Sequence, residues 1–555
     1  MENALIYRFS DFYKKLYLIF HTVKYMKLRQ IINRLIRKFK KIKICYSSKY
    51  ELRQRVGQWL CMEMYPQTYY GNMTFKFLNF QLSINSWNDH KCSKLWLYNL
   101  HYFDDLNAFN SKKRKILHLE LIHNWIENNP PLKGNGWEPY PTSLRIVNWV
   151  KYILSNNIND ENILRSLYIQ AQVLSQMLEF HLFGNHLFAN AKALIFAGVF
   201  FSGKQAEYYL ELGLNILDKE LNEQILSDGG HFERSPMYHN IILNDILDLC
   251  NLAQVYEIVH LRKRLNIWTA KIYKMLEFSS AMSHPDGNIS FFNDSTFGIS
   301  PTHSQLMLYA KSLFDINEGD LISSDNPINY IFFKESGYVS ASTTNSKVIM
   351  DIAKVGPDYI PGHAHADTLS YELSIFGERV IVNSGINQYG LSELRLEQRK
   401  TKSHNTIEVN NMDSSEVWSG FRVAKRANPK VIDISLRHET LLVEGSHDGY
   451  KKFSGKIIHT RKWILSDNQL IIDDFICGTF QTAISYLHFH PDISLDVIDG
   501  GVRLKLKSGK IVTLYIPCPF TVDDSFWYPE FGVSRLNKRI IIHLIKDQLT
   551  VTFRW

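Results

Sequence analysis

The chain has 555 residues, of which 45% are hydrophobic and 13% aromatic. This is enough apolar material for two or three globular domains and excludes a disordered chain. No apolar run reaches the length of a membrane span. The net charge of +8 is uneven, because residues 1–50 hold 13 Lys and Arg against two acids, a local charge of +11, which leaves −3 for residues 51–555. The nearly neutral body does not suggest a nucleic-acid partner.

The basic segment, residues 1–50, has no clean apolar core and no small-residue cleavage site, so it does not look like a secretory signal. Its apolar residues recur at near-helical spacing between the cations: Leu16, Ile19, Phe20, Val23, Met26, Ile31, Leu35 and Phe39. Two interpretations stay open. The helix lies on anionic lipid or another polyanion, with peripheral membrane contact, or it packs on the next domain.

Six cysteines are scattered along the chain without CxxC spacing: Cys45, Cys61, Cys92, Cys250, Cys477 and Cys518. This usage is typical of reduced, mostly buried thiols. Together with the missing signal, it favours a cytoplasmic protein, at most peripheral at the inner face of the membrane.

From about residue 105 to 325 the pattern indicates helices of ordinary length joined by short loops. The expected helices are 115–128, 143–156, 160–183, 189–201, 204–224, 240–256 and 259–283. Consecutive helices with short connections form antiparallel hairpins. We therefore predict an α/α layered domain, an incomplete toroid, over residues 95–327.

From about residue 328 short strand-like runs replace the helices. Examples are 348–352, 440–444, 469–474, 502–507 and 540–545. Short strands with frequent turns are typical of an antiparallel β-sandwich. The predicted fold class is α+β multidomain, with a basic helical segment and short strands over 1–94, the α/α toroid over 95–327 and the β-sandwich over 328–555.

Within the second half, residues 361–406 combine strand patterns with histidines. Period-two alternation on either side of a Gly-Glu dipeptide predicts a β-hairpin. His363 and His365 are two apart, so on an extended chain they would share one face. His365, Asn383 and His404 could converge from successive strands, and two imidazoles with an amide or carboxylate oxygen suit a divalent transition metal.

In the helical half, Asn185 and His186 precede a helix expected from about Leu187. A helix N-terminus with adjacent amide and imidazole donors can hold a carboxylate. The alternative is that Asn185 is simply the helix cap.

Tyr238 lies just before another expected helix, in a loop with Glu233, Arg234 and His239. A tyrosine that exchanges protons needs nearby positive charge or donors to bring its pKa towards neutrality, which Arg234 and a histidine could supply. The alternative is a buried tyrosine whose hydroxyl bonds to a loop.

Six ordered motifs give the chain a family resemblance. They are GWEPYPTSLRIVNW (136–149), NHLFANAKAL (185–194), DGGHFERSPMYH (228–239), HPDGNISFFND (284–294), GHAHADTLSYEL (362–373) and SHNTIEVN (403–410) followed by SSEVWSGFRV (414–423). With these motifs the chain resembles bacterial heparinase II/III-like proteins, which are related to heparin and alginate lyases built from an α/α toroid and a β-sandwich.

The resemblance implies an active site between the two domains. It makes Asn185 the residue that binds and neutralises a uronate carboxylate, with His186 beside it. It makes Tyr238 the catalytic tyrosine and His363 the catalytic histidine. Further contacts to the substrate are expected from Glu233, Arg234, Trp137, His239, Asp294 and Arg399.

The resemblance also implies a metal-binding trio, His365, Asn383 and His404. The family pattern is two histidines and an Asp, and Asn383 departs from it because an amide brings no charge. The expected cofactor is one structural divalent ion, zinc, which would brace a loop rather than activate water.

The implied reaction is β-elimination on an anionic, uronate-containing polysaccharide. Neutralising the carboxylate acidifies the neighbouring C–H and stabilises the enolate-like anion. A Tyr or His acts as the base, and Tyr can protonate the leaving oxygen. Two other classes stay open: a uronate epimerase or other sugar-modifying enzyme of surface-polysaccharide synthesis, and a non-catalytic glycan-binding protein.

Overall fold

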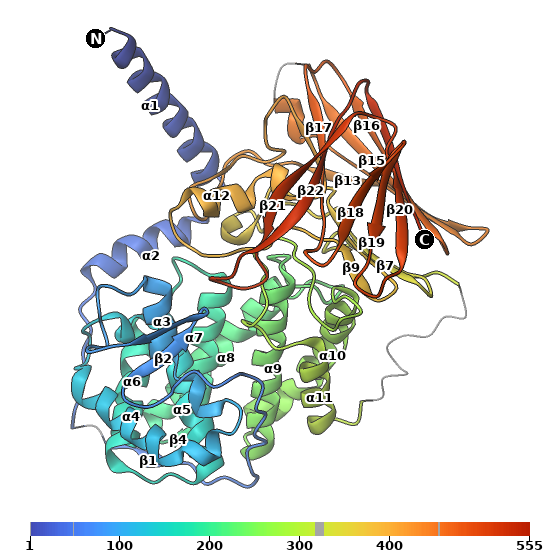
Figure 1. Cartoon of the computed structure of the whole chain (residues 1–555). Helices are drawn as coiled ribbons and strands as arrows, with labels where there is room; N and C mark the ends of the chain where they lie inside the picture. The colour runs from blue at the N-terminus through green and yellow to red at the C-terminus, as the bar shows by residue number, and fades with distance from the viewer. Residues whose placement is uncertain (1, 48, 317–326, 453–454) are drawn as a thin grey trace.

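The computed structural model describes residues 2–47, 49–316, 327–452 and 455–555. Figure 1 shows a helical body, blue to green, against a body of sheets, orange to red. The helices of the helical body end at Leu313 and the large sheets begin at Asn329, on either side of the proposed boundary at 327/328. Within the described residues, every helix is too short or too polar to cross a bilayer.

The N-terminal segment begins with two helices, of which α1 projects away from both bodies (Figure 1). Short strands follow, so the expected mixture of helices and strands is found. The elements are α1 (Glu2–Val23), α2 (Leu28–Phe39), β1 (Glu51–Leu52), β2 (Thr74–Phe77) and β3 (Phe80–Ser83).

The helical body contains the helices α3 to α11 and the short strand β4. Two predicted helices, 115–128 and 204–224, match the observed bounds. The elements are α3 (Lys94–Tyr102), α4 (Lys115–Asn128), α5 (Pro139–Asn156), α6 (Glu161–Gln176), α7 (Gly184–Phe200), β4 (Phe201–Ser202), α8 (Lys204–Gln224), α9 (Pro236–Val255), α10 (Val259–Ala281) and α11 (His303–Leu313).

Four helix ends differ from the sequence expectation by four residues or more: the starts of α5, α7 and α9 and the end of α6. Helix α6 stops at Gln176 instead of residue 183, and beyond it the Asn190 side chain accepts from the Glu179 amide at 2.8 Å. Helix α9 begins at Pro236, which needs no amide partner in a first turn, after the Ser235 cap. Helix α7 begins at Gly184, so Asn185 and His186 lie inside its first turn.

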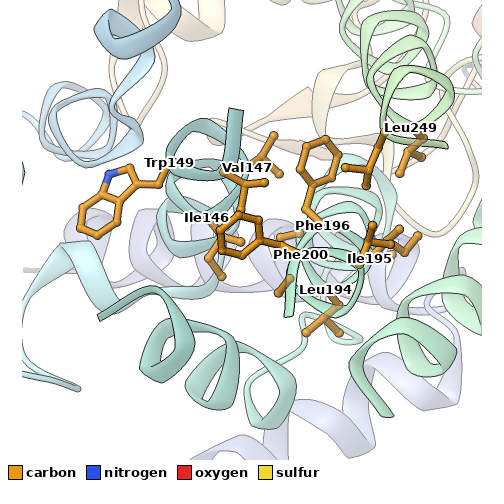
Figure 2. Packing of buried hydrophobic residues seen from close by; sticks show 14 of the residues in the cluster. Ile146, Val147, Trp149, Leu194, Ile195, Phe196, Phe200 and Leu249 are labelled. Atoms are coloured by element: carbon orange, nitrogen blue, oxygen red, sulfur yellow. The ribbon is translucent and has the colours of Figure 1, made fainter. Parts of the chain in front are cut away.

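Buried aromatic and branched side chains fill the space between the helices. Figure 2 shows Ile146, Val147 and Trp149 of α5 near Phe196 and Phe200 of α7, with Leu249 of α9 beyond them. These residues are almost fully excluded from solvent. Burial of this apolar surface, at about 25 cal/mol per Å², is the main stabilising term for such a body.

The described residues of the second half form three larger antiparallel sheets and the two-stranded antiparallel sheet β11-β12. One has the order β5-β6-β7-β8-β9, another β10-β17-β22-β21, and the largest β13-β14-β15-β16-β23-β20-β19-β18. The predicted hairpin around Gly377 is the pair β8 (Tyr371–Ile375) and β9 (Glu378–Ile381). The remaining strands are β5 (Asn329–Phe333), β6 (Tyr338–Ser342), β7 (Ser346–Asp351), β10 (Ile407–Val409), β11 (Val417–Trp418), β12 (Arg422–Val423), β13 (Pro429–Arg437), β14 (Thr440–His447), β15 (Ile458–Ser466), β16 (Gln469–Cys477), β17 (Ala483–His488), β18 (Ser494–Ile498), β19 (Gly501–Lys505), β20 (Ile511–Tyr515), β21 (Phe520–Trp527), β22 (Arg535–His543) and β23 (Gln548–Arg554).

A buried ion pair connects the largest sheet to the 361–406 stretch. Arg461 of β15 pairs with Asp474 of β16, and its Nη1 donates to the carbonyl oxygens of Leu369 and Asn405 at 2.6 Å each. These carbonyls flank the two histidine-containing segments. The sheet therefore fixes the loops that carry the predicted site.

The loop before α9 is held close to its neighbours by glycine. Gly229 has φ +89°, and a Cβ there would lie 2.4 Å from the Lys274 carbonyl oxygen. A Cβ on Gly230 would lie 2.0 Å from the Ser336 Oγ. The two glycines of the DGGHFERSPMYH motif thus let this loop approach α10 and the β5–β6 turn.

We expect Gly229→Ala to lower stability more than Gly500→Ala. Both sites have positive φ, +89° and +72°, but a Cβ on Gly500 meets open space. The shared left-handed conformation costs about 1–2 kcal/mol, and overlap at Gly229 adds about 1–3 kcal/mol. Urea denaturation followed by circular dichroism measures the difference. Equal midpoints for the two variants would contradict the close approach.

Candidate active site

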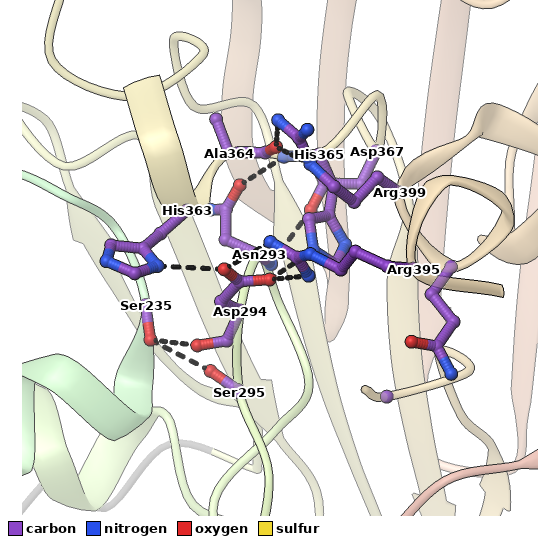
Figure 3. A network of polar contacts seen from close by, with 12 residues as sticks. Ser235, Asn293, Asp294, Ser295, His363, Ala364, His365, Asp367, Arg395 and Arg399 are labelled. Carbon is purple, nitrogen blue, oxygen red and sulfur yellow. Dashed lines mark hydrogen bonds and ion pairs between the residues drawn. The ribbon is translucent and has the colours of Figure 1, made fainter. Parts of the chain in front are cut away.

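Residues from both halves converge on the carboxylate of Asp294, which is fully buried (Figure 3). His363 Nδ1 lies 2.8 Å from Oδ2, and His365 Nε2 lies 2.8 Å from Oδ1. Arg395, on helix α12 (Glu393–Arg399), donates to both oxygens, with 2.7 Å from Nη2 to Oδ2. Although burial opposes ionisation, Arg395 and the two histidines hold the pKa of Asp294 well below its usual range.

This contact fixes the tautomer of His363. A carboxylate only accepts, so His363 donates through Nδ1 and its Nε2 is left as an acceptor. Nε2 lies 3.9 Å from Glu233 Oε2, beyond hydrogen-bond distance. The expectation of an extended chain is corrected here, because Pro361–His363 forms a short 3-10 helix. His363 and His365 contact opposite oxygens of Asp294 rather than sharing a strand face.

Tyr238 lies against His363 in the first turn of α9, with ring centroids 4.1 Å apart. Ser235 caps this turn by accepting from the Tyr238 amide at 3.2 Å. The Tyr238 hydroxyl contacts the Tyr389 hydroxyl at 3.0 Å. Burial and then Tyr389 raise the pKa of Tyr238 well above its usual value. The expected lowering by Arg234 does not occur, because Arg234 donates to backbone carbonyls instead.

The predicted anion site at the N-terminus of α7 holds the chain's own Glu233. The backbone amide of Asn185 donates to this carboxyl group, and burial raises the pKa of Glu233. Gly184 has φ +56°, and a Cβ there would lie 2.7 Å from Glu233 Oε1. Glu233 Oε2 is buried without a hydrogen-bond partner. This oxygen therefore faces His363 and is available to form a hydrogen bond.

Asn185 lines a cleft of about 360 Å³ between the helical body and the segments 297–299 and 530–531. Ile241, one turn after Tyr238 on α9, also lines this cleft. His186 packs against Tyr140 in a tilted arrangement, with ring centroids 4.4 Å apart, and its Nδ1 lies 3.3 Å from Glu179 Oε2. Burial alone would lower the pKa of His186, but Glu179 raises it. The positively charged form of the His186 imidazole, next to the cleft, is thereby favoured.

All six residues expected to touch substrate are more than nine-tenths buried, and beside Glu233 and Asp294 the other four bond to the chain's own backbone. Trp137 Nε1 donates to Asn129 O, and the His239 Nε2 contacts Met275 O. Arg234 binds the carbonyls of the β5–β6 turn and Gly356, and Arg399 binds those of Ala364, Ser419 and Arg422. In this structure these four residues hold the loops of the site, and their contact with substrate stays a prediction.

His365, Asp367 and His404 form a buried cluster that could hold a metal ion. The facing nitrogens, His365 Nδ1 and His404 Nε2, are 3.2 Å apart. Burial lowers the pKa of His365 to about 4 and that of His404 well below 6.5, so both rings are in the neutral form that binds metals. Asn383 Oδ1, the expected third ligand atom, accepts from the Asn405 side chain at 3.3 Å. The carboxylate that lies beside the two histidines is that of Asp367.

Sequence reasoning missed three residues of this site. Asp367 lies in the quoted GHAHADTLSYEL motif, and its carboxylate next to the two histidines was an available signal. Arg395 and Tyr389 belong to the chain between the hairpin and His404, where no motif marks them. Only the tertiary fold brings Arg395 to Asp294 and Tyr389 to Tyr238.

Comparison with solved structures supports the fold. A crystal structure of heparinase III superposes with a TM-score of 0.63 at 20% identity, covering 83% of this chain and 76% of that one. Heparan sulfate lyase HepC from Pedobacter heparinus gives a TM-score of 0.56 at 15% identity, covering 95% and 87%. The α/α and β-sandwich architecture is therefore the one expected from the sequence.

Curated relatives match over part of their length. A heparin-sulfate lyase of Bacteroides stercoris is 27% identical over 293 residues, 48% of this chain and 42% of the relative. A heparin-sulfate lyase of Pedobacter heparinus is 26% identical over 248 residues, 41% of this chain and 36% of the relative. The chain thus spans less than half the length of these relatives in the matched regions.

Two family models match nearly the whole chain between them. The model of the heparinase II/III N-terminus matches residues 17–318, and that of the heparinase II/III-like C-terminal domain matches residues 326–555. Together they cover the loop of Tyr238 and the segment of His363. The chain belongs to the heparinase II/III-like family.

Proposed function

We propose that the protein is a polysaccharide lyase that cleaves a uronate-containing glycan by β-elimination. The observation that carries the proposal is the close contact of Tyr238 and His363, whose ring centroids are 4.1 Å apart with the planes tilted by 36° and which come from the two halves of the chain. One member has a free imidazole nitrogen, and the other keeps its phenolic proton. A base and an acid therefore lie together in the resting protein.

In the proposed reaction His363 Nε2 takes the C5 proton of the uronate. The electron pair of that C–H bond forms the C4–C5 double bond, and the C4–O glycosidic bond breaks. Tyr238 donates its proton to the leaving oxygen, which suits a hydroxyl whose pKa burial has raised. Asp294 keeps His363 in the required tautomer and stabilises the imidazolium that forms.

The uronate carboxylate needs a neutralising partner for the C5 proton to become acidic. We assign this role to the Asn185 side chain, which lines the cleft, and to His186, whose positive form Glu179 favours. Glu233, with a pKa raised by burial, can donate to the same carboxylate when protonated. No step in this scheme requires Arg234 or Arg399 to meet substrate.

We propose that the cluster of His365, Asp367 and His404 holds zinc. Two neutral imidazoles and a carboxylate are a suitable donor set. When bound, zinc would supply structural bracing of the segments 363–367 and 403–405 rather than an activated water. His365 would then keep its contact to Asp294 through the other ring nitrogen.

Tyr238→Phe should strongly slow elimination, because it removes the proton donor and leaves the ring in place. We expect a loss of 10²–10⁴ in kcat, roughly the usual contribution of a general acid. The assay is the ultraviolet absorbance of the new C4–C5 double bond across a panel of uronate glycans. Tyr152→Phe is the matched control, since it removes a buried hydroxyl that donates to Lys115 O, away from the cleft.

Full turnover by Tyr238→Phe would exclude the proposed acid. Incorporation of solvent deuterium at C5 without cleavage would identify an epimerase instead. Glycan binding without either reaction, unaffected by Tyr238→Phe, would identify a binding protein.

Added zinc should raise the melting temperature of metal-free protein, because a ligand bound only to the folded state stabilises it by about 2.7 kcal/mol at 100 times its Kd. His404→Gln should remove this shift. His447→Gln is the matched control, because His447 and His459 form another buried histidine pair, also 3.2 Å apart. No shift in the unmodified protein, or equal shifts in both variants, would contradict the assignment.

A further inference from the structure

Helix α2 is held on the protein through its polar side. Gln30 Nε2 donates to the Tyr359 carbonyl oxygen at 3.3 Å, and Arg37 Nη1 lies 2.8 Å from His181 Nε2. Lys27, which precedes the helix, pairs with an acid of α8. Helix α2 therefore docks on the helical body through charge and hydrogen bonds.

The end of α1 is held by the second half of the chain, also through polar groups. Trp418 Nε1 donates to Thr22 Oγ1 at 3.1 Å, and Thr22 Oγ1 donates to the Val423 carbonyl oxygen at 3.4 Å. The Arg426 guanidinium lies 4.2 Å from the centroid of the Tyr25 ring. The two helices are thus fixed where they meet, and α1 projects from there away from both bodies (Figure 1).

The apolar residues of α2 lie on the side that faces away from the protein. They form an exposed stripe that consists of Leu28, Ile31, Ile32, Leu35, Ile36 and Phe39. At about 3.6 residues per turn, this stripe lies opposite the face of Gln30, Asn33 and Arg37. Gln30 is buried, whereas Phe39 is 83% exposed. Helices of soluble proteins normally turn the apolar side inward, but α2 presents it to the solvent.

Helix α1 enlarges this apolar surface. Its exposed apolar side chains are Phe12, Tyr13, Leu16, Tyr17, Phe20 and Val23. Phe12, Leu16 and Phe20 are spaced by four residues and Val23 follows by three, so these four residues share one face of the helix. Apolar residues gathered on two neighbouring helices are more than the single exposed residues that any protein surface carries, and they mark an interaction site.

Cations without acids surround the stripe of α2. Residues 12–50 contain 12 Lys and Arg and no Asp or Glu. By helical geometry Arg34 and Lys38 lie along one edge of the stripe, and Arg29 lies along the other edge. All three side chains are exposed. An amphipathic helix of this kind can bury its apolar side at the headgroup level of a bilayer while its cations reach the anionic headgroups.

The charge and the apolar stripe together identify the occupant of this surface. A second copy of the chain would bring the same cations to the contact, and the two faces would repel each other. A dissolved anionic glycan would neutralise the cations, but it offers no apolar surface to cover Leu35 and Phe39. An anionic bilayer offers both. We infer that α1 and α2 dock the protein on an anionic lipid surface, with the apolar stripe of α2 inserted between the headgroups.

The test is sedimentation of the full chain with vesicles of phosphatidylcholine alone or of phosphatidylcholine with phosphatidylglycerol. We expect binding to the anionic vesicles only, and release at high salt because salt screens the attraction. Leu35→Glu with Phe39→Glu should weaken binding at least ~10-fold, because the stripe then carries charge. The matched control is Val497→Glu with Ile545→Glu, at apolar sites of the sheet body that are 64% and 70% exposed, and it should bind like the unmodified chain.

A second pair of variants tests the cations. Arg34→Gln with Lys38→Gln should also weaken binding to the anionic vesicles at least ~10-fold, since each cation near the surface contributes to the attraction. Arg503→Gln with Lys505→Gln removes the same charge at exposed positions of β19 and should leave binding unchanged.

Equal binding to both vesicle types by the unmodified chain, or binding to neither, would overturn the inference. Full binding by the Leu35→Glu, Phe39→Glu variant would also overturn it, because the stripe would then not enter the bilayer. A dimer of the unmodified chain that this variant converts to a monomer would assign the stripe to self-association instead.

Discussion

The site depends on one buried charge, the Asp294 carboxylate. Asp294 belongs to the helical half, in the segment between α10 and α11, whereas its partners His363, His365 and Arg395 come from the second half. A buried carboxylate is tolerated only with opposite charge and full hydrogen bonding. Those partners are present only when the two bodies are docked. The same contacts therefore join the halves and prepare the imidazole for proton transfer.

Much of the fold could be predicted from periodicity. Helix spacing located α4 and α8, and the alternation around Gly377 located the β8–β9 hairpin. The errors were at helix ends. The starts of α7 and α9 depend on Gly184 and on the Ser235-Pro236 cap, and the end of α6 depends on Asn190, a residue distant in sequence. A helix cap formed by neighbouring residues can be predicted from the sequence, but a contact with a residue of another helix cannot.

The candidate site could be predicted in part from the sequence. The motifs placed Tyr238 and His363 in different halves, and the structure brings them together. The expected electrostatics of Tyr238 failed because the contacts of Arg234 are decided by the tertiary fold, which directs that guanidinium to backbone carbonyls. Arg395 was missed for the same reason. Residue type and spacing indicate which groups are available, and packing decides which charges face one another.

The contact between α2 and Tyr359 has a practical consequence. Tyr359 lies four residues before His363, and its carbonyl accepts from Gln30 while its ring lies 3.7 Å from Lys27 Nζ. Its hydroxyl also donates to Glu223 at 2.7 Å. A shortened chain that begins after residue 50, an obvious choice for improving solubility, would lose these supports of the histidine loop. Low activity in such a chain would report a loosened loop rather than a missing catalytic group.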